Sequence, residues 1–446
     1  MKNWRIILAL ALPSLLAFAT STLTGTINLI MIGQMGAIAI GAVGVVNIIM
    51  YNAWALCSGF GHTINYLVAQ NHGSGEMKKG VERTYVALYN GIILSIILIL
   101  VGLFAPEAIL HLTGGSSELI AAGVPYLKIR LFALSLGIIS FILQGFMRGV
   151  GDTKTPMVLS IASNVVMIFF TYTLTYGNWG FPEIGLPGAA WGVLIGEAIA
   201  FLGSAYVYFV RMNPQFSTRV RAKFQKLEVK LILAESGKLG IQEFAMSLAM
   251  LVFTAFVARV SDQALAANEV ALNVMSLGFM PAFAFGSTAT ILVGREIGRG
   301  NPLQARRYGT ETAIIGTIML LILGTAEYFL ADKIALIYNA NDPGVFKLAA
   351  DLIKISAFLQ LFDGLFNIYG GCLRGLGDTG FLVKASFSLS WLVFVPLAYL
   401  LTFVFDMHSV GAWIGLYAFI TLYGIAVTVR FYRTDWQNVS VKQSGV

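Results

Sequence analysis

Four acidic residues lie well inside apolar stretches of the chain: Glu197, Glu243, Glu269 and Asp363. An ionisable group in hydrocarbon costs about 2.5–3.5 kcal/mol on membrane-insertion scales, so each of these side chains needs a partner or a function. Carboxylate oxygens bind hard cations such as Na⁺, and a buried carboxylate can instead take up a proton. These residues therefore indicate cation binding within apolar helices.

The composition of the chain places these carboxylates in a membrane protein. Hydrophobic residues make up 57% of the 446 residues, charged residues make up 11%, and the mean hydropathy is +0.78. Soluble domains carry about 25% charged residues. The same numbers exclude a disordered chain, a secreted disulfide scaffold and a coiled coil, and the widely separated Cys57 and Cys372 indicate neither a disulfide framework nor a metal site.

The apolar segments predict helices that span the membrane. A spanning helix needs roughly 20 mostly apolar residues, whereas the strands of a membrane barrel are alternating units of about 10 residues. The sequence therefore predicts an all-α polytopic membrane protein with twelve transmembrane helices, at residues 6–32, 38–68, 84–104, 118–146, 156–176, 188–210, 238–258, 264–293, 309–330, 346–370, 382–403 and 409–431.

Basic residues predict the orientation of these helices. If the N-terminus is cytoplasmic, all but six of the 29 Lys and Arg residues fall on the cytoplasmic side, and the exceptions are Lys128, Arg130, Arg259, Lys333, Lys347 and Lys354. Positively charged loops stay inside, so both termini are expected in the cytoplasm. Residues 211–237 form a basic cytoplasmic linker, which is either a solvated loop at the lipid surface or a binding site for a cytosolic partner.

Two pairs of segments reveal an internal repeat. The segment YLVAQNHGSGEMKKG (66–80) recurs as ILVGREIGRGNPLQA (291–305), and RGVGDT (148–153) recurs as RGLGDT (374–379). The offset is 225 or 226 positions in both cases, so the chain consists of two six-helix halves. Each half has an even number of helices, which makes them parallel repeats.

The repeat defines the predicted domains. They are an N-lobe at 1–210 with helices 1–6, the linker at 211–237, and a C-lobe at 238–446 with helices 7–12. Parallel repeats normally enclose a substrate cavity and operate by alternating access.

Several motifs resemble those of the multidrug and toxic compound extrusion (MATE) transporters. They are the doubled R-G-x-G-D-T signature, the paired G-x-G loops after helices two and eight, TINLIMIGQMG (26–36) and AANEVALNV (266–274). The resemblance runs over essentially the whole chain. It implies a two-lobed antiporter of a prokaryotic inner membrane that exports organic, often cationic, compounds in exchange for protons or sodium ions.

In the C-lobe, the resemblance implies a coupling-cation site. Asp363 lies eleven residues before Arg374, where relatives with such a site have an aspartate, and Glu243 of helix seven is its expected partner. At 1.5 Å per residue, both lie roughly 8–10 Å from the cytoplasmic helix ends. Asp363 and Glu243 would be the metal ligands if the coupling ion is Na⁺, and Glu197 is a third coupling candidate. The alternatives are hydrogen bonding in a helix interface for Asp363 and Glu197, and a solvated acid for Glu243.

The N-lobe departs from the family pattern. Many prokaryotic relatives have an aspartate five residues before Gly33, but here that residue is Asn28, and Asn164 of helix five is not followed by the usual Asn and Asp. We expect Asn28, Asn164, Asp363 and Glu269 to contact substrate. Hydrogen bonding between helices is the alternative for the two amides, and a solvated helix end for Glu269.

No motif indicates an enzyme. The chain has no G-x-x-x-x-G-K-[ST] loop for ATP, and its four histidines lack metal-ligand spacing. No cofactor is expected beyond the transported H⁺ or Na⁺, and the expected partners are small organic cations and membrane lipid, without nucleic acid, for a chain acting as a monomer. The alternatives are a lipid-linked oligosaccharide flippase of the same superfamily, which usually has extra helices, and a passive channel or non-transporting receptor.

Overall fold

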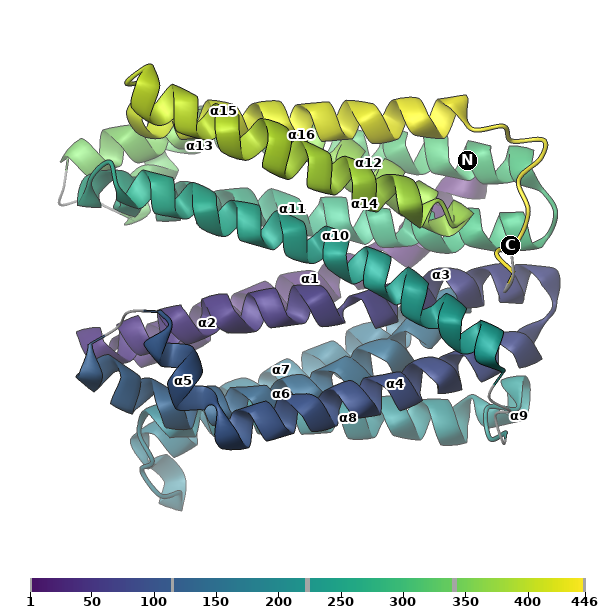
Figure 1. Ribbon diagram of the computed structural model, residues 1–446, viewed down its shortest axis with the longest axis horizontal. Coiled ribbons are helices and arrows are strands. Elements are labelled where there is room, and N and C mark those ends of the chain that lie inside the picture. Colours follow the sequence, from purple (N-terminus) through teal and green to yellow (C-terminus); the bar gives the residue numbers. More distant parts are fainter. Residues whose placement is uncertain (1, 114–115, 221–224, 339–342, 444–446) are drawn as a thin grey trace. The chain divides into compact units, whose positions relative to one another are not determined.

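The computed structural model describes residues 2–113, 116–220, 225–338 and 343–443, and this part of the chain is helical, without β-strands. Each predicted span corresponds to one helix or to a series of consecutive helices and helical turns (Figure 1). The N-terminal ones are α1 (Lys2–Gly33), α2 (Ala37–Cys57), α3 (Gly59–Ser74), α4 (Met77–Phe104), α6 (Ser117–Gly149), α7 (Lys154–Tyr176) and α8 (Leu186–Tyr206).

The second half of the chain contains the remaining long helices. They are α10 (Lys226–Ala258), α11 (Asp262–Gly298), α12 (Pro302–Tyr338), α13 (Pro343–Leu376), α14 (Thr379–Ser388), α15 (Val395–Tyr399) and α16 (His408–Arg433). Short helices α5 (Pro106–His111) and α9 (Asn213–Phe216), a 3₁₀ turn at Asn178–Gly180 and π-helical turns at Val207–Arg211, Leu389–Phe394 and Leu400–Val404 complete the described elements.

Within the described residues, eleven helical segments are long and apolar enough to cross a membrane. Helix α13, with 34 residues, is also long enough, but it carries charged side chains, among them Asp363 and Arg374. The all-α polytopic fold predicted from the sequence is confirmed.

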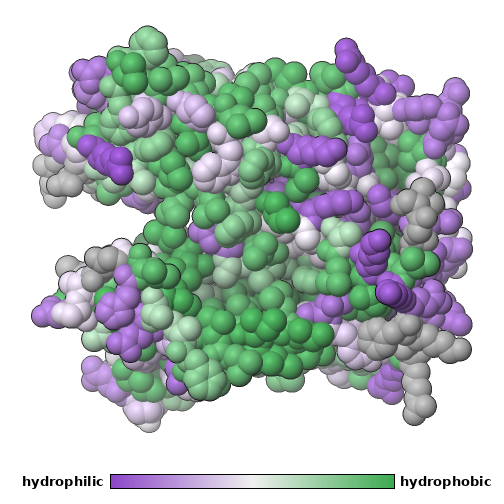
Figure 2. All heavy atoms as spheres, viewed as in Figure 1, coloured by the Kyte–Doolittle hydropathy of each residue, from purple (hydrophilic) through white to green (hydrophobic). Residues whose placement is uncertain are grey.

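The surface of the helices fits a lipid environment. On α4, Ile93 is 58% exposed and Ile97 is 50% exposed. Hydrophobic side chains cover the flanks of the helices, and hydrophilic ones gather near the helix ends (Figure 2). Water-soluble proteins rarely expose contiguous apolar patches of this extent.

The chain divides into two compact units. The N-terminal unit comprises Leu16–Gly240 and Gln443, and the C-terminal unit comprises residues 2–15 and Ile241–Lys442. Helices α1 and α10 thus contribute residues to both units.

The repeat is visible in the packing of each unit. In the N-terminal unit α6 packs against α2, α3, α4 and α8, and in the C-terminal unit α13 packs against α11, α12 and α16. A Cβ added at Gly145 of α6 would lie 2.6 Å from the carbonyl oxygen of Gly61, and Gly371 of α13 meets Gly286 in the same way. Glycine at these positions lets the helix backbones approach each other closely.

The doubled R-G-x-G-D-T motif has the same backbone geometry in both units. Gly151 has φ +92° and Gly377 has φ +83°. Each donates its N–H to the carbonyl of the arginine three residues earlier, at 2.8 Å to Arg148 and 2.9 Å to Arg374. This left-handed turn suits glycine and closes the ends of α6 and α13.

One helix boundary differs from the prediction. Residues 226–237, which the sequence assigns to the basic linker, form the start of α10. Glu228 on this segment accepts a hydrogen bond from Nε of the buried Arg83 at 2.9 Å, and Glu235 accepts one from the Tyr66 hydroxyl at 2.8 Å. These contacts attach residues 226–237 to α3 and α4. Hydropathy alone does not predict that this segment is part of a spanning helix.

Candidate functional site

The N-terminal unit contains two adjoining cavities of about 290 Å³ and about 340 Å³. We call the first the amide-lined cavity, because Asn28 and Asn164 line it, and the second the aromatic cavity, because Trp54 and Tyr51 line it. Four residues line both: Asn47, Arg130, Val193 and Glu197.

The amide-lined cavity brings together residues from distant parts of the sequence. Asn164 of α7 donates a hydrogen bond to Oγ of Ser21 on α1 at 3.3 Å. Oδ1 of Asn28 is shielded from solvent and accepts no hydrogen bond from the described part of the chain. Three predicted site residues, Asn28, Asn164 and Glu197, therefore meet at one cavity.

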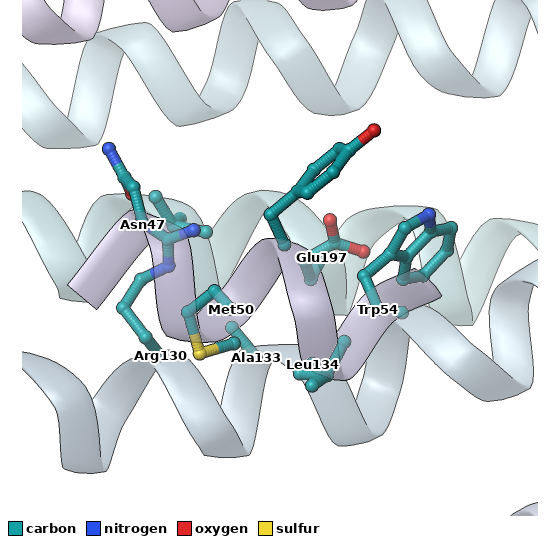
Figure 3. A pocket seen from close by; sticks show the side chains of 10 residues that line it. Asn47, Met50, Trp54, Arg130, Ala133, Leu134 and Glu197 are labelled. Atoms are coloured by element: carbon teal, nitrogen blue, oxygen red, sulfur yellow. The ribbon is translucent and has the colours of Figure 1, made fainter. Parts of the chain in front are cut away.

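Two opposite charges face both cavities. Nη1 of Arg130 on α6 donates to Oδ1 of Asn47 at 3.1 Å and to the Tyr126 hydroxyl at 2.9 Å. Glu197 on α8 interacts electrostatically with Arg130, but no hydrogen bond or ion pair joins the two side chains in the described structure. Figure 3 shows the Arg130 guanidinium beside Asn47 and the Glu197 carboxylate beside Trp54.

A glycine makes room for the Glu197 carboxylate. A Cβ at Gly137 would lie 3.1 Å from Oε2 of Glu197 and 3.7 Å from Cζ3 of Trp54. Gly137 follows Arg130 by two turns of α6, on the same face of the helix. At the repeat offset of 226 positions, Gly137 corresponds to Asp363, so each unit carries a carboxylate near this position, from α8 in one unit and from α13 in the other.

Asp363 is buried in the C-terminal unit. Its side chain is 6% exposed, and its Oδ1 accepts a hydrogen bond from Nδ2 of Asn367 at 3.2 Å. The same Nδ2 donates to the Asp363 carbonyl at 3.0 Å. An amide one turn along α13 is thus the hydrogen-bond partner assigned to this carboxylate.

Glu243 lies in the same unit but does not contact Asp363 through a hydrogen bond within the described residues. It is half-buried on α10 and interacts electrostatically with Arg374 and Tyr423. The Tyr423 ring lies 4.5 Å, centroid to centroid, from Phe366, which is three residues after Asp363. Tyr423 thus interacts with Glu243 and packs on a ring that lies about one helical turn from Asp363.

The two remaining predictions concern Glu269 and a metal site. Glu269 is exposed on α11 and lines neither cavity. In the described ranges, no group of three or more His, Cys, Asp and Glu side chains is placed to hold a metal ion. Sodium binding at Asp363 and Glu243 therefore stays a prediction.

The sequence did not single out Arg130, Asn47 or Glu327. Arg130 follows Lys128 and reads as one of two basic residues near the outer membrane surface. Glu327 of α12 is 8% exposed and accepts a hydrogen bond from Nε2 of Gln360 on α13. The sequence signal for Arg130 and Glu327 is a charge within an apolar segment, but Asn47 and Gln360, which they contact, lie on other helices.

Duplicated six-helix halves and polar cavities between helices that can span a membrane are typical of secondary transporters. A family model described as MatE matches residues 13–173 and 239–400, which is well over half of the chain. The chain therefore belongs to the MatE family of transporters. The second match begins one repeat offset after the first.

Two bacterial proteins are similar over nearly their whole length. The probable multidrug resistance protein NorM of Thermotoga maritima is 26% identical, over 98% of this chain and 93% of the relative. The multidrug resistance protein PmpM of Pseudomonas aeruginosa is 27% identical, over 96% of this chain and 91% of the relative. Among solved structures, an outward-facing multidrug resistance MATE family transporter of the MOP superfamily has a TM-score of 0.88 at 17% identity and covers 96% of both chains, which shows the shared fold.

Proposed function

We propose that this chain is a cation-coupled antiporter that exports organic compounds of the multidrug type by alternating access. The observation that carries the proposal is the Asp363 carboxylate, which is buried on α13, a helix long enough to span a membrane, with an amide as its hydrogen-bond partner. A charge at such a position is expensive unless it binds a cation or a proton. The names of the NorM and PmpM relatives support the multidrug assignment.

The proposed coupling uses the acids of the C-terminal unit. An incoming H⁺ or Na⁺ loads Asp363 and Glu243, which neutralises charge within the helices and favours the conformation that releases substrate outside. Cation and substrate then act on linked conformations of one protein, and each shifts the population in its own direction. Glu197 is a third acid that cations can reach, because it lines both cavities of the N-terminal unit.

The proposed substrate site is formed by the two cavities of the N-terminal unit. Asn28 and Asn164 supply amide hydrogen bonds, and Glu197 supplies a negative charge for an amine. Trp54 supplies an aromatic ring for flat or cationic groups. Asp363 and Glu269 are proposed as further contacts during the transport cycle.

The proposed location is the inner membrane of a prokaryote, with both termini in the cytoplasm. The support is the bias of the Lys and Arg positions in the sequence, because basic loops remain on the cytoplasmic side.

Transport in vesicles tests the function. We expect Asp363→Asn to reduce gradient-driven efflux of a fluorescent organic cation to the level of empty vesicles, because the amide cannot be loaded. Asp351→Asn is the matched control, since Asp351 is exposed on the same helix, and it should behave as wild type. Efflux that is unchanged in Asp363→Asn would sink the proposal, and repeating the wild-type assay with a sodium gradient and a collapsed proton gradient identifies the coupling ion.

A further inference from the structure

Glu327 is a buried acid of the C-terminal unit that the proposed coupling at Asp363 and Glu243 does not use. Its side chain is 8% exposed on α12, and its Oε2 accepts a hydrogen bond from Nε2 of Gln360 on α13. Within the described residues, Glu327 forms no ion pair. A carboxylate that is buried without a cationic partner is costly, and binding a proton removes this cost because it removes the charge.

The charged side chains on the neighbouring stretches of helix do not neutralise Glu327. Asp332, further along α12, pairs with Lys354 of α13 at a distance of 3.2 Å between Oδ1 and Nζ. On α11, which packs against both helices, residues 270–294 include no acidic, basic, histidine or tyrosine side chain. The other acid near Gln360 on α13 is Asp363. Lys354 is therefore engaged by a different acid.

Gln360 is placed to bind both the charged and the protonated form of Glu327. Its side chain is 2% exposed, and a Cβ added at Gly278 of α11 would collide with its amide, so the amide fills a confined space. Its Oε1 is shielded from solvent and accepts no hydrogen bond from the described part of the chain. Nε2 donates to the carboxylate, and a half-turn of the amide lets Oε1 accept from the hydroxyl of the protonated acid.

We infer that Glu327, oriented by Gln360, is a further proton-binding site of the C-terminal unit, and that its proton is exchanged for substrate together with the cation at Asp363. This inference rests on the proposed transport function and adds a coupling residue to it. Gln360 acts as a positioning residue, because it reaches the proton only through Glu327.

The position of Glu327 complements that of Glu243. Gln360, the partner of Glu327, lies three residues before Asp363, about one turn along α13. Arg374, with which Glu243 interacts electrostatically, lies eleven residues after Asp363. The partners of the two acids on α13 thus lie on opposite sides of Asp363. An antiporter loads its cation from one side of the membrane and releases it to the other, so an acid on each side suits the two steps.

Infrared difference spectroscopy of the purified full chain tests proton binding directly. Acidification should produce C=O stretching bands of protonated carboxyl groups in apolar surroundings. Glu327→Gln should lose one component of these bands, different from the component that Asp363→Asn loses. Gln360→Met should keep the Glu327 component but shift it, because the hydrogen-bonding amide is gone. Asp351→Asn, which removes an exposed acid of α13, should leave these bands unchanged.

The steady-state substrate gradient tests the coupling. In liposomes with no membrane potential and a pH difference of about one unit, each exchanged proton supports a substrate gradient of about tenfold. Glu327→Gln exchanges one proton fewer, so its gradient should be about tenfold smaller than that of wild type and of Asp351→Asn. A purely structural role would slow transport without this shift in the steady state. Exchange of labelled substrate at equal pH on both sides shows that each variant is folded.

The inference is overturned if Glu327→Gln loses no band, or if it builds the same substrate gradient as wild type. Wild-type export that follows a sodium gradient alone would also overturn it, while leaving the proposed cation-coupled export intact. Failure of the proposed function is a different result. Wild type then builds no substrate gradient with either ion, although acidification still produces the Glu327 component, which supports the proton site alone.

Discussion

Individual residues give the two units different chemistry at equivalent positions. Gly137 in the N-terminal unit corresponds to Asp363 in the C-terminal unit. The glycine leaves space that the Glu197 carboxylate occupies, whereas Asp363 supplies a carboxylate from α13 itself. The N-terminal unit therefore has cavities lined by a basic and an acidic residue, Arg130 and Glu197, whereas the C-terminal unit has the acids Glu243 and Asp363.

Gly137→Ala tests how closely the Glu197 carboxylate is placed. The new Cβ would lie 3.1 Å from Oε2 of Glu197, so the carboxylate must shift away from its position in the aromatic cavity. We expect binding of amine-bearing ligands to weaken by about threefold to tenfold, equivalent to about 1 kcal/mol. The measurement is equilibrium dialysis of the purified full chain with a fluorescent organic amine.

The control for this substitution is Gly44→Ala on α2, where an added Cβ meets nothing within 4 Å. It should leave ligand binding unchanged. Equal binding by Gly137→Ala and wild type would show that the Glu197 carboxylate does not contact the amine from this position.

At the scale of elements, hydropathy predicts where the helices lie in the sequence, but it does not predict which residues of different helices contact each other. Each predicted span is present because a long apolar segment in a membrane satisfies its backbone hydrogen bonds as a helix. Hydropathy does not predict the start of α10 at Lys226, and Arg83 and Tyr66, which contact Glu228 and Glu235 on this segment, are far away in sequence. The site was only partly predictable. Asn28, Asn164 and Glu197 stand out as polar residues in apolar segments, but the contact of Arg130 with Asn47 joins residues that are far apart in sequence.

The contact between Arg83 and Glu228 predicts the stability of the first turns of α10. Arg83 is 1% exposed and donates to Glu228 and to Oδ1 of Asn71, so Glu228→Gln removes the ion pair while the contact with Asn71 remains. Removing one partner of a buried ion pair costs up to about 3–5 kcal/mol in other proteins. We expect a clearly lower Tm for Glu228→Gln in thermal unfolding of the detergent-solubilised chain.

Glu107→Gln is the control for this measurement, because the Glu107 side chain is 73% exposed. Its Tm should equal that of wild type. If Glu228→Gln and Glu107→Gln unfold at the same temperature, the ion pair does not hold this part of α10.

At the scale of the whole molecule, the chain combines duplication with specialisation. The two matches of the MatE model and the similar turns at Gly151 and Gly377 show one six-helix design used twice. Parallel repeats of this kind support alternating access in other transporters. We propose that the N-terminal unit binds the substrate and that the C-terminal unit binds the coupling cation, so the same conformational change serves both.

The most direct test of this account is the cation flux that substrate elicits. The purified chain is reconstituted into liposomes, the exchanged ion is recorded with a pH-sensitive dye or with labelled sodium, and an organic substrate is added to one side. We expect substrate to drive a cation flux in the opposite direction in wild type and in Asp351→Asn, and no such flux in Asp363→Asn. Substrate transport without an accompanying cation flux in wild type would contradict the account.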